Sequence, residues 1–252
     1  MNPVVACVGT THPLISTGLL IELSAVRELG ARPVAVIAGV SAQTAARVLL
    51  RRPLDAAAIA AQFDALAEVA IGAFCVGALL DPASVRAVAR ALGAFPGTPV
   101  ICDPVIAASG GDRLADDATL AALRDELFPL CSLLTPNAGE AALLAAMPVD
   151  SLAAMHAALP ALLALGPAAV LLKGGHLAGD PVDVLGDAES VTVFPGERLP
   201  FELRGTGSLL AAAIAARCAH GDALSAAVAA GRAFVRERIA SGMPFAGMRV
   251  GY

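Results

Sequence analysis

Residues 203–216 have the sequence LRGTGSLLAAAIAA, in which two glycines and two hydroxyl residues precede a run of small apolar residues. This order predicts a tight turn followed by a helix. Because glycine lacks a Cβ, successive N–H groups of residues 205–208 can approach one anion, and the positive end of the helix dipole favours it. The stretch is therefore a candidate cradle for an oxyanion or a phosphate. A tight turn that is only capped by Thr206 or Ser208 is the alternative, and the motif alone leaves both open.

Around this stretch, short apolar runs alternate with longer alanine-rich segments. The apolar runs predict strands at 3–9, 32–39, 69–77, 98–105, 131–137 and 168–175. Besides the helix of the opening stretch, helices are expected near 18–29, 55–68, 82–93, 115–127, 138–146, 151–165 and 222–240. Continuously apolar strands are buried on both faces, as in a parallel sheet between two layers of helices. We therefore predict an α/β protein with a three-layer α/β/α sandwich and a mostly parallel central sheet.

Residues 181–203 have a different pattern, because apolar and polar residues alternate there and turn residues occur at Gly186-Asp187 and Pro195-Gly196. This pattern predicts antiparallel strands at an edge of the sheet. The sequence contains no internal repeat, low-complexity tract or linker. We expect a single domain over residues 1–252.

Composition narrows the possible partners. Hydrophobic residues make up 57% of the chain, but the excess is mostly alanine, and no uncharged apolar run reaches the length of about 18 residues expected of a membrane span. The first residues, MNPVVACVGTTHP, lack the basic and apolar stretches of a secretory signal, which predicts a cytoplasmic protein. A net charge of −5, one Tyr, no Trp and no basic cluster beyond Arg51 and Arg52 argue against nucleic-acid binding. We expect a small-molecule partner, no nucleic acid and no membrane.

The five cysteines are scattered along the chain, without a CxxC pair or a metal-ligand spacing to a histidine. We expect them to be reduced, buried thiols. Neither a GxxxxGK[ST] motif nor a GxGxxG motif after the first strand is present, which excludes these two nucleotide-binding motifs.

Polar residues cluster where the predicted strands end, which is where open α/β sheets bind ligands. In TPNAGE, Asn137 and Glu140 lie three apart, so on a starting helix their oxygens can face one side and hold hydrated Mg²⁺. A capping box formed by the same pair is the alternative, and both can hold together. Lys173 ends a strand in LLKGGH and can neutralise a phosphate or remain solvated. Asp103, in ICDPV, can organise metal-bound water or cap the next turn.

Five motifs in one order carry a resemblance to a known family: DPV, SGGDRL, TPNAGEAALL, AAVLLKGGHL and RGTGSLLAAAIAA. Together they resemble the hydroxymethylpyrimidine and phosphomethylpyrimidine kinases of thiamine biosynthesis, which belong to the ribokinase-like superfamily. The similarity is dense from about residue 99 to residue 240. It is diffuse before that, where ELGARPVAVIAGVSAQT resembles a family segment that ends in TAQNT.

The resemblance implies a ribokinase-like fold with ATP lying along the strand ends. It places the ATP phosphates at the turn, with Gly205, Thr206 and Gly207 as the anion hole and Ser208 in the catalytic position. It also implies that Mg²⁺ lies near Glu140 and Asn137 and that Lys173 lies close to the nucleotide. In the kinase hypothesis that follows, Asp103 also supports the metal, and Gly175 is a further residue of the nucleotide site. Homodimers are common in this family, but the apolar residues of the early helices could form such an interface or the core.

The departures from the family concern the substrate side. Where the family has an acidic, glycine-rich stretch close to GSDSSGGAGIQADL, this chain has GTTHPLISTGLLIEL, with Thr11 among the wall residues of the pocket. Gln43 is the counterpart of the family's pocket glutamine, whereas the expected methionine is Ala78 and the expected lysine of AKSG is Ser109. A more apolar pocket wall is therefore expected.

Ser208 is a further departure, because the family has a cysteine there and the wider superfamily has an aspartate that acts as a base. An unassisted serine is a poor proton acceptor, so the increment in rate that a base provides is at risk. Arg204, where the family often has histidine, could add a cation beside the transferred group or be an ordinary surface arginine.

Two hypotheses follow. The first is an ATP-dependent kinase that acts on a pyrimidine precursor of thiamine or on another small vitamin-like alcohol. The second is a nucleotide-binding regulatory protein that retains the fold and the cradle but has lost turnover.

Overall fold

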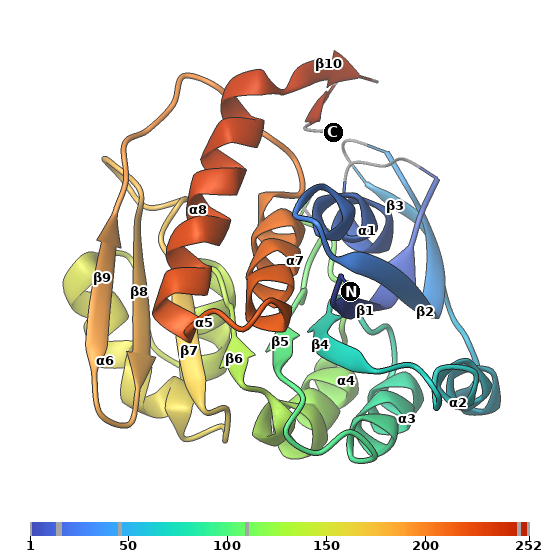
Figure 1. Cartoon of the computed structure of the whole chain (residues 1–252). Coiled ribbons are helices and arrows are strands. Elements are labelled where there is room, and N and C mark those ends of the chain that lie inside the picture. Colours follow the sequence, from blue (N-terminus) through green and yellow to red (C-terminus); the bar gives the residue numbers. More distant parts are fainter. Residues whose placement is uncertain (1, 14–16, 45–46, 109–110, 246–247, 251–252) are drawn as a thin grey trace.

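The computed structural model describes residues 2–13, 17–44, 47–108, 111–245 and 248–250. Its central feature is a nine-stranded sheet with the order β3-β2-β1-β4-β5-β6-β7-β8-β9 (Figure 1). The strands are β1 Val4–Thr11, β2 Arg32–Gln43, β3 Val48–Pro53, β4 Ile71–Val76, β5 Val100–Cys102, β6 Leu133–Leu134, β7 Ala169–Lys173, β8 Val182–Asp187 and β9 Val191–Pro195. The six central strands, β2, β1, β4, β5, β6 and β7, are parallel to one another. β3 pairs antiparallel with β2, and β8 and β9 add two antiparallel strands at the other edge. A separate hairpin is formed by β10 Met243–Phe245 and β11 Met248–Val250.

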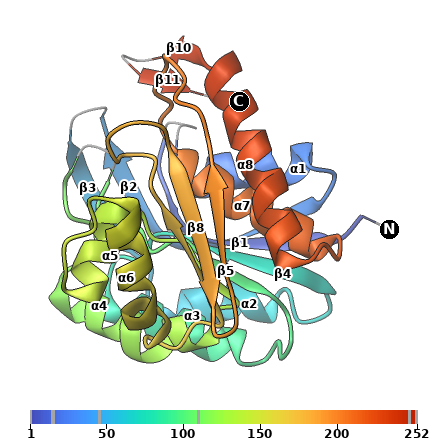
Figure 2. The same cartoon turned by 90° about the vertical axis from the view of Figure 1, so that its left-hand side faces the viewer.

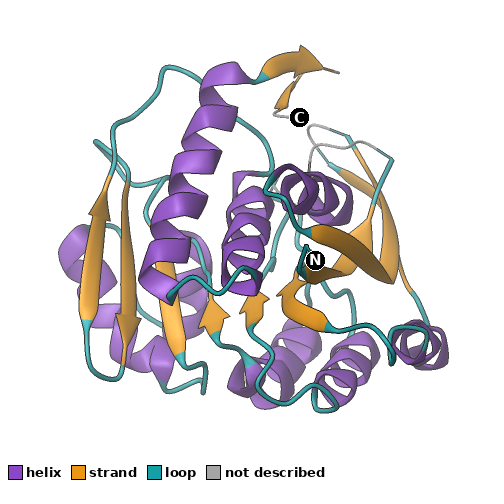
Figure 3. Ribbon diagram, viewed as in Figure 1, coloured by secondary structure: helices purple, strands orange, loops and turns teal. Residues whose placement is uncertain are grey.

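Helices cover both faces of this sheet, as Figures 2 and 3 show. One face packs against α1 Gly18–Glu28, α7 Thr206–Ala219 and α8 Leu224–Ser241. The other face packs against α2 Ala56–Asp64, α3 Pro82–Leu92, α4 Asp117–Ala122, α5 Ala138–Ala145 and α6 Leu152–Leu163. The predicted three-layer α/β/α sandwich is confirmed. Within the described ranges, no helix has the length and apolarity that a membrane crossing requires.

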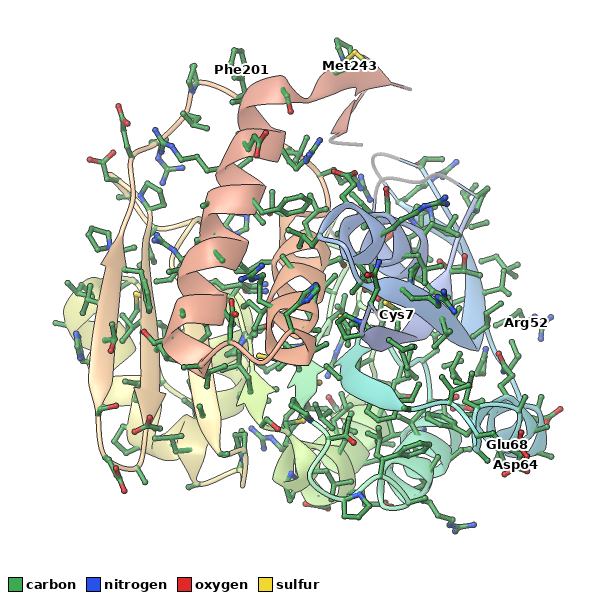
Figure 4. The ribbon with its side chains drawn as sticks, viewed as in Figure 1. Cys7, Arg52, Asp64, Glu68, Phe201 and Met243 are labelled. Atoms are coloured by element: carbon green, nitrogen blue, oxygen red, sulfur yellow. The ribbon has the colours of Figure 1, made fainter. Side chains whose placement is uncertain are left out.

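The two hydrophobic cores explain why the strands are continuously apolar. Along β1, Val5 and Cys7 pack into the core beneath α1 and α7, whereas Ala6 and Val8 pack into the opposite core. In Figure 4, Cys7 lies inside the molecule, while Arg52 lies at its outer edge. All five cysteines are free thiols, and four of them are buried, while Cys218 is partly exposed.

Some elements differ from the prediction. The antiparallel edge strands β8 and β9 are confirmed, but β3 is missing from the prediction because its sequence, VLLRRP, does not alternate and is mostly exposed. The regular helix expected over 115–127 is shorter, because α4 spans only Asp117–Ala122. A π-helical turn, Leu123–Leu127, follows it directly. A 3₁₀ turn that contains Pro129 follows, because proline cannot continue a regular helix.

The topology brings the candidate residues to one edge of the sheet. β1 lies between β2 and β4, so the strand order reverses there, and such switch points form ligand-binding crevices at the carboxyl ends of the strands. The sequence motifs follow the carboxyl ends of β1, β4, β5, β6 and β7. Ser109 lies outside the described residues.

Candidate active site

The glycine turn at the start of α7 has no side-chain cap. Gly205 is the N-cap residue with φ of +81°, a conformation that favours glycine, and the helix begins at Thr206. The alternative in which Thr206 or Ser208 caps this turn is therefore wrong. The N–H groups of the first helical turn have no partner within the helix, so they are available to an anion.

Gly207 brings this turn against a buried ion pair. A Cβ at Gly207 would lie 3.0 Å from Asp103 Oδ2 and 3.1 Å from Lys173 Nζ. No larger residue fits at this position without moving one of the two charges. The turn therefore faces Lys173, and the second glycine of the GTG motif lets it approach the ion pair without displacing either charge.

Asp103 and Lys173 form the ion pair, with 2.8 Å between Asp103 Oδ1 and Lys173 Nζ. Their side chains are only 7% and 13% exposed, so Lys173 is not the solvated strand-end lysine that the sequence left open. The Thr135 hydroxyl donates a second hydrogen bond to Asp103 Oδ1. Burial works against the charge of Lys173, but Asp103 and Glu140 outweigh it and raise the pKa of the ammonium group. A fixed cation therefore lies beside the turn.

Asn137 and Glu140 form a complete capping box at the start of α5. The Asn137 N–H donates to Glu140 Oε2 at 2.9 Å, and the Glu140 N–H donates to Asn137 Oδ1 at 3.0 Å. The Ile106 N–H donates to Glu140 Oε1 at 3.4 Å. Burial raises the pKa of Glu140 to about 7, a shift that Lys173 opposes and Asp103 supports. The capping role predicted for this pair is confirmed, and each carboxylate oxygen retains a lone pair beyond its N–H bond.

The described part of the chain contains no group of three or more His, Cys, Asp or Glu residues arranged to hold a metal. Magnesium is commonly held by one or two carboxylates together with water and substrate phosphates. Asp103 and Glu140 offer such a pair of carboxylates. Both lie near Lys173, because the negative charge of each raises the pKa of its ammonium group.

The predicted substrate residues lie at neighbouring strand ends. Thr11 ends β1 and Gln43 ends β2, while Ala78 follows β4. The Thr10 hydroxyl donates to the Ala78 carbonyl at 2.9 Å, which joins the ends of β1 and β4. The Gln43 side chain donates to the Ser41 hydroxyl at 3.0 Å. The sheet therefore places all three predicted residues at the switch point.

Ser208 is largely withdrawn from solvent, and Arg204 is partly so. Ser208 is 6% exposed, and its Oγ accepts the Gly18 N–H at 3.3 Å. Arg204 is partly buried, which lowers the pKa of its guanidinium group. The pKa of His12 is lowered, mainly by burial and also by the positive charge of Arg204, while a hydrogen bond with Thr17 opposes part of this shift. Arg204 is thus partly exposed, and its place beside the transferred group stays a prediction.

Two residues of the site region were missed at the level of sequence. Gly174 is required, because a Cβ there would overlap the Val182 carbonyl oxygen, whereas the predicted Gly175 has open space around it and its carbonyl accepts from Arg198. Glu22 is buried beside Ser208, and the one available signal was a single carboxylate within the apolar run LLIEL.

Comparison with known proteins identifies the family. The sequence model described as phosphomethylpyrimidine kinase matches residues 16–251. The chain belongs to the phosphomethylpyrimidine kinase family. It is 33% identical over 247 residues to a Streptomyces coelicolor protein named hydroxymethylpyrimidine/phosphomethylpyrimidine kinase, covering 97% of this chain and 91% of the relative. The resemblance found in the sequence motifs is confirmed.

Two solved structures share the fold of this chain over nearly all of its length. A phosphomethylpyrimidine kinase from Clostridium difficile matches with a TM-score of 0.83 and 24% identity, covering 94% of this chain and 99% of that one. A Bacillus subtilis pyridoxal kinase, solved as an ADP complex, matches with a TM-score of 0.91 and 23% identity, covering 100% and 97%. These likenesses confirm the ribokinase-like fold.

Proposed function

We propose that this chain is an ATP-dependent kinase of thiamine biosynthesis. It transfers the γ-phosphate of ATP to the hydroxyl of hydroxymethylpyrimidine or to the phosphate of its monophosphate. Membership of the family and a relative named for both activities support this proposal. The observation that carries it is the approach of Gly207 to the buried Asp103–Lys173 pair at the start of α7.

On the nucleotide side, the N–H groups of the turn formed by residues 205–207 stabilise negative charge on the phosphate. Lys173 neutralises phosphate charge from the other side, and Arg204 adds a second cation. Gly175, after β7, leaves the nucleotide room to approach. Phosphoryl transfer depends mainly on positioning and charge stabilisation, which these groups provide.

The oxygen atoms near Lys173 fit Mg²⁺. Asp103 Oδ2 lies at the turn, and both oxygens of Glu140 retain lone pairs after accepting one N–H each. Asp103 and Glu140 would hold the ion, in part through water, while the Asn137 amide oxygen is used in the helix cap. When bound, Mg²⁺ neutralises charge on the phosphates.

On the substrate side, Thr11, Gln43 and Ala78 line the place of the pyrimidine at the switch point. Ser208 lies in the first turn of α7 on this side, and its hydroxyl lies next to the position of the transferred group. The Cβ-free backbone at Gly207 keeps the cradle open toward the same place.

A coupled ADP-release assay tests this function with hydroxymethylpyrimidine, its phosphate and pyridoxal as acceptors. Turnover of either pyrimidine, with pyridoxal the poorer acceptor, is expected. Calorimetric titration with ATP measures nucleotide binding in parallel. Binding of ATP without turnover of any acceptor would refute the kinase and favour the regulatory nucleotide-binding protein.

A further inference from the structure

Glu22 is a buried carboxyl group that the site as described does not use. It lies on α1 among buried Leu19, Ile21, Ala25 and Val26, and its side chain is 1% exposed. Its Oε2 has no hydrogen-bond partner among the described residues. Burial of a carboxyl without full pairing destabilises the folded chain. A group retained at such a cost points to a role other than packing.

The packing of α1 against α7 brings Glu22 to Ser208. Gly18, one turn before Glu22, donates its N–H to Ser208 Oγ, although the two residues are 190 positions apart. Residues four apart lie on one face of a helix, so Gly18 and Glu22 face α7 together. Gly18 has φ of +63°, and a Cβ there would lie 3.0 Å from the Thr10 carbonyl oxygen, so the close approach of α1 requires glycine.

The Ser208 hydroxyl is oriented by these two contacts. Its oxygen accepts the Gly18 N–H at 3.3 Å. Burial raises the pKa of Glu22, and the Ser208 side chain lies close enough to the carboxyl to oppose part of that rise. With the Gly18 N–H at its oxygen, the Ser208 hydroxyl still has its own proton to donate to Glu22. Ser208 Oγ keeps a second lone pair, which can receive a proton from a substrate hydroxyl.

The groups that face Glu22 come from β4 and from the ends of β4 and β5. On β4, a hydrogen bond with Cys7 raises the pKa of Cys75, and burial and the Glu22 charge raise it further. After β5, the Asp103 charge raises the pKa of Glu22, which burial has already raised, to about 8 in all. At the end of β4, a Cβ at Gly77 would lie 2.9 Å from Glu22 Oε1, so the carboxyl lies beneath the backbone next to Ala78.

We propose that Glu22 is a positioning residue that orients the Ser208 hydroxyl and accepts its proton during phosphoryl transfer. The inference rests on the proposed kinase function. The substrate oxygen forms a bond to the γ-phosphorus as the bond from that phosphorus to the bridging oxygen of ATP breaks, with its electron pair going to ADP. The substrate proton passes to Ser208 Oγ while the Ser208 proton passes to Glu22. Glu22 therefore ends the step protonated and later returns the proton to solvent.

This arrangement supplies what an isolated serine lacks. A serine hydroxyl alone is a poor proton acceptor, and a carboxylate that takes its proton removes this limitation once Glu22 is ionised, which becomes the main form as the pH approaches 8. The pair of Ser208 and Glu22 would thus take the place of the single cysteine or aspartate that occupies this position in relatives.

The test compares Glu22→Gln, Ser208→Ala and the double variant in the ADP-release assay, with Glu28→Gln as the control. Glu28 lies on the same helix, pairs with Arg238 on the surface side and should leave kcat unchanged. Glu22→Gln should lower kcat by about 10²–10⁴-fold and leave ATP affinity within about threefold. The double variant should lose no more than the worse single variant.

A pH series provides the readout that a structural role would not change. The kcat of the wild-type chain should rise toward pH 8, and this rise should be absent in Glu22→Gln. A Glu22→Gln chain that binds ATP and keeps its kcat, or its rise with pH, would overturn the inference and leave the kinase function intact. Additive losses in the double variant would also overturn it. A wild-type chain without turnover would overturn both proposals.

Discussion

Replacement of Glu22 by glutamine should change the way in which the free energy of unfolding depends on pH. Burial and the charge of Asp103 raise the pKa of the Glu22 carboxyl to about 8, against an ordinary value of 4.5, although Ser208 lowers it in part. Because the folded-state pKa is the higher one, the folded chain holds this proton more tightly than the unfolded chain. The proton therefore stabilises the fold fully below pH 4.5, and this stabilisation is lost as the pH rises toward 8.

The magnitude follows from the two pKa values. At pH 7 the unfolded chain has released the proton and the folded chain has mostly kept it, so the loss is about 3 kcal/mol, at about 1.4 kcal/mol for each pH unit above 4.5. Above pH 8 the loss reaches about 5 kcal/mol and stays constant. Glutamine has no such proton. The free energy of unfolding of Glu22→Gln minus that of the wild type should therefore rise by about 3 kcal/mol from pH 4 to pH 7.

Urea denaturation of both chains in the same buffers from pH 4 to pH 9, followed by circular dichroism, measures this difference. The comparison across pH removes the constant effect of placing an amide where the carboxyl stood. Glu126→Gln is the control, because that side chain is 41% exposed, and its difference from the wild type should stay within about 0.5 kcal/mol. A Glu22→Gln difference that is the same at pH 4 and pH 7 would refute the reasoning.

Three further changes test the rest of the site. Gly207→Ala should lower kcat/KM for ATP about tenfold or more, because its methyl group would crowd the buried ion pair. A wild-type kcat/KM in the ADP-release assay would contradict this role of Gly207. Lys173→Met should lower the free energy of unfolding by about 3–5 kcal/mol, because it leaves the buried Asp103 without its ion-pair partner. The control Arg86→Met, which removes an exposed ion pair, should lower it by less than about 1 kcal/mol. Similar losses for the two variants in urea denaturation would argue against the buried pairing. Asn137→Ala should cost about 1 kcal/mol in the same measurement because it removes the cap of α5, and no loss of stability would show that the cap is not needed.

The architecture was predictable from sequence because it depends on patterns that neighbouring residues set. Continuously apolar strands require burial on both faces, and the two cores on either side of the sheet provide it. The capping box of Asn137 and Glu140 is a local motif, and it forms as its spacing indicates. β3 was missed because VLLRRP carries no alternation and is defined only by its pairing with β2.

The sequence by itself determined the layers, the order of the strands along the chain and the motifs that follow the strand ends, since each rests on local periodicity or spacing. Only the tertiary structure decided which charges meet. It pairs Lys173 with Asp103 across 70 residues and places Gly18 and Glu22 of α1 against Ser208. The protonation of Glu22 was decided there as well, because a pKa depends on burial and on the charges nearby in space, and neither is fixed by the order of residues along the chain.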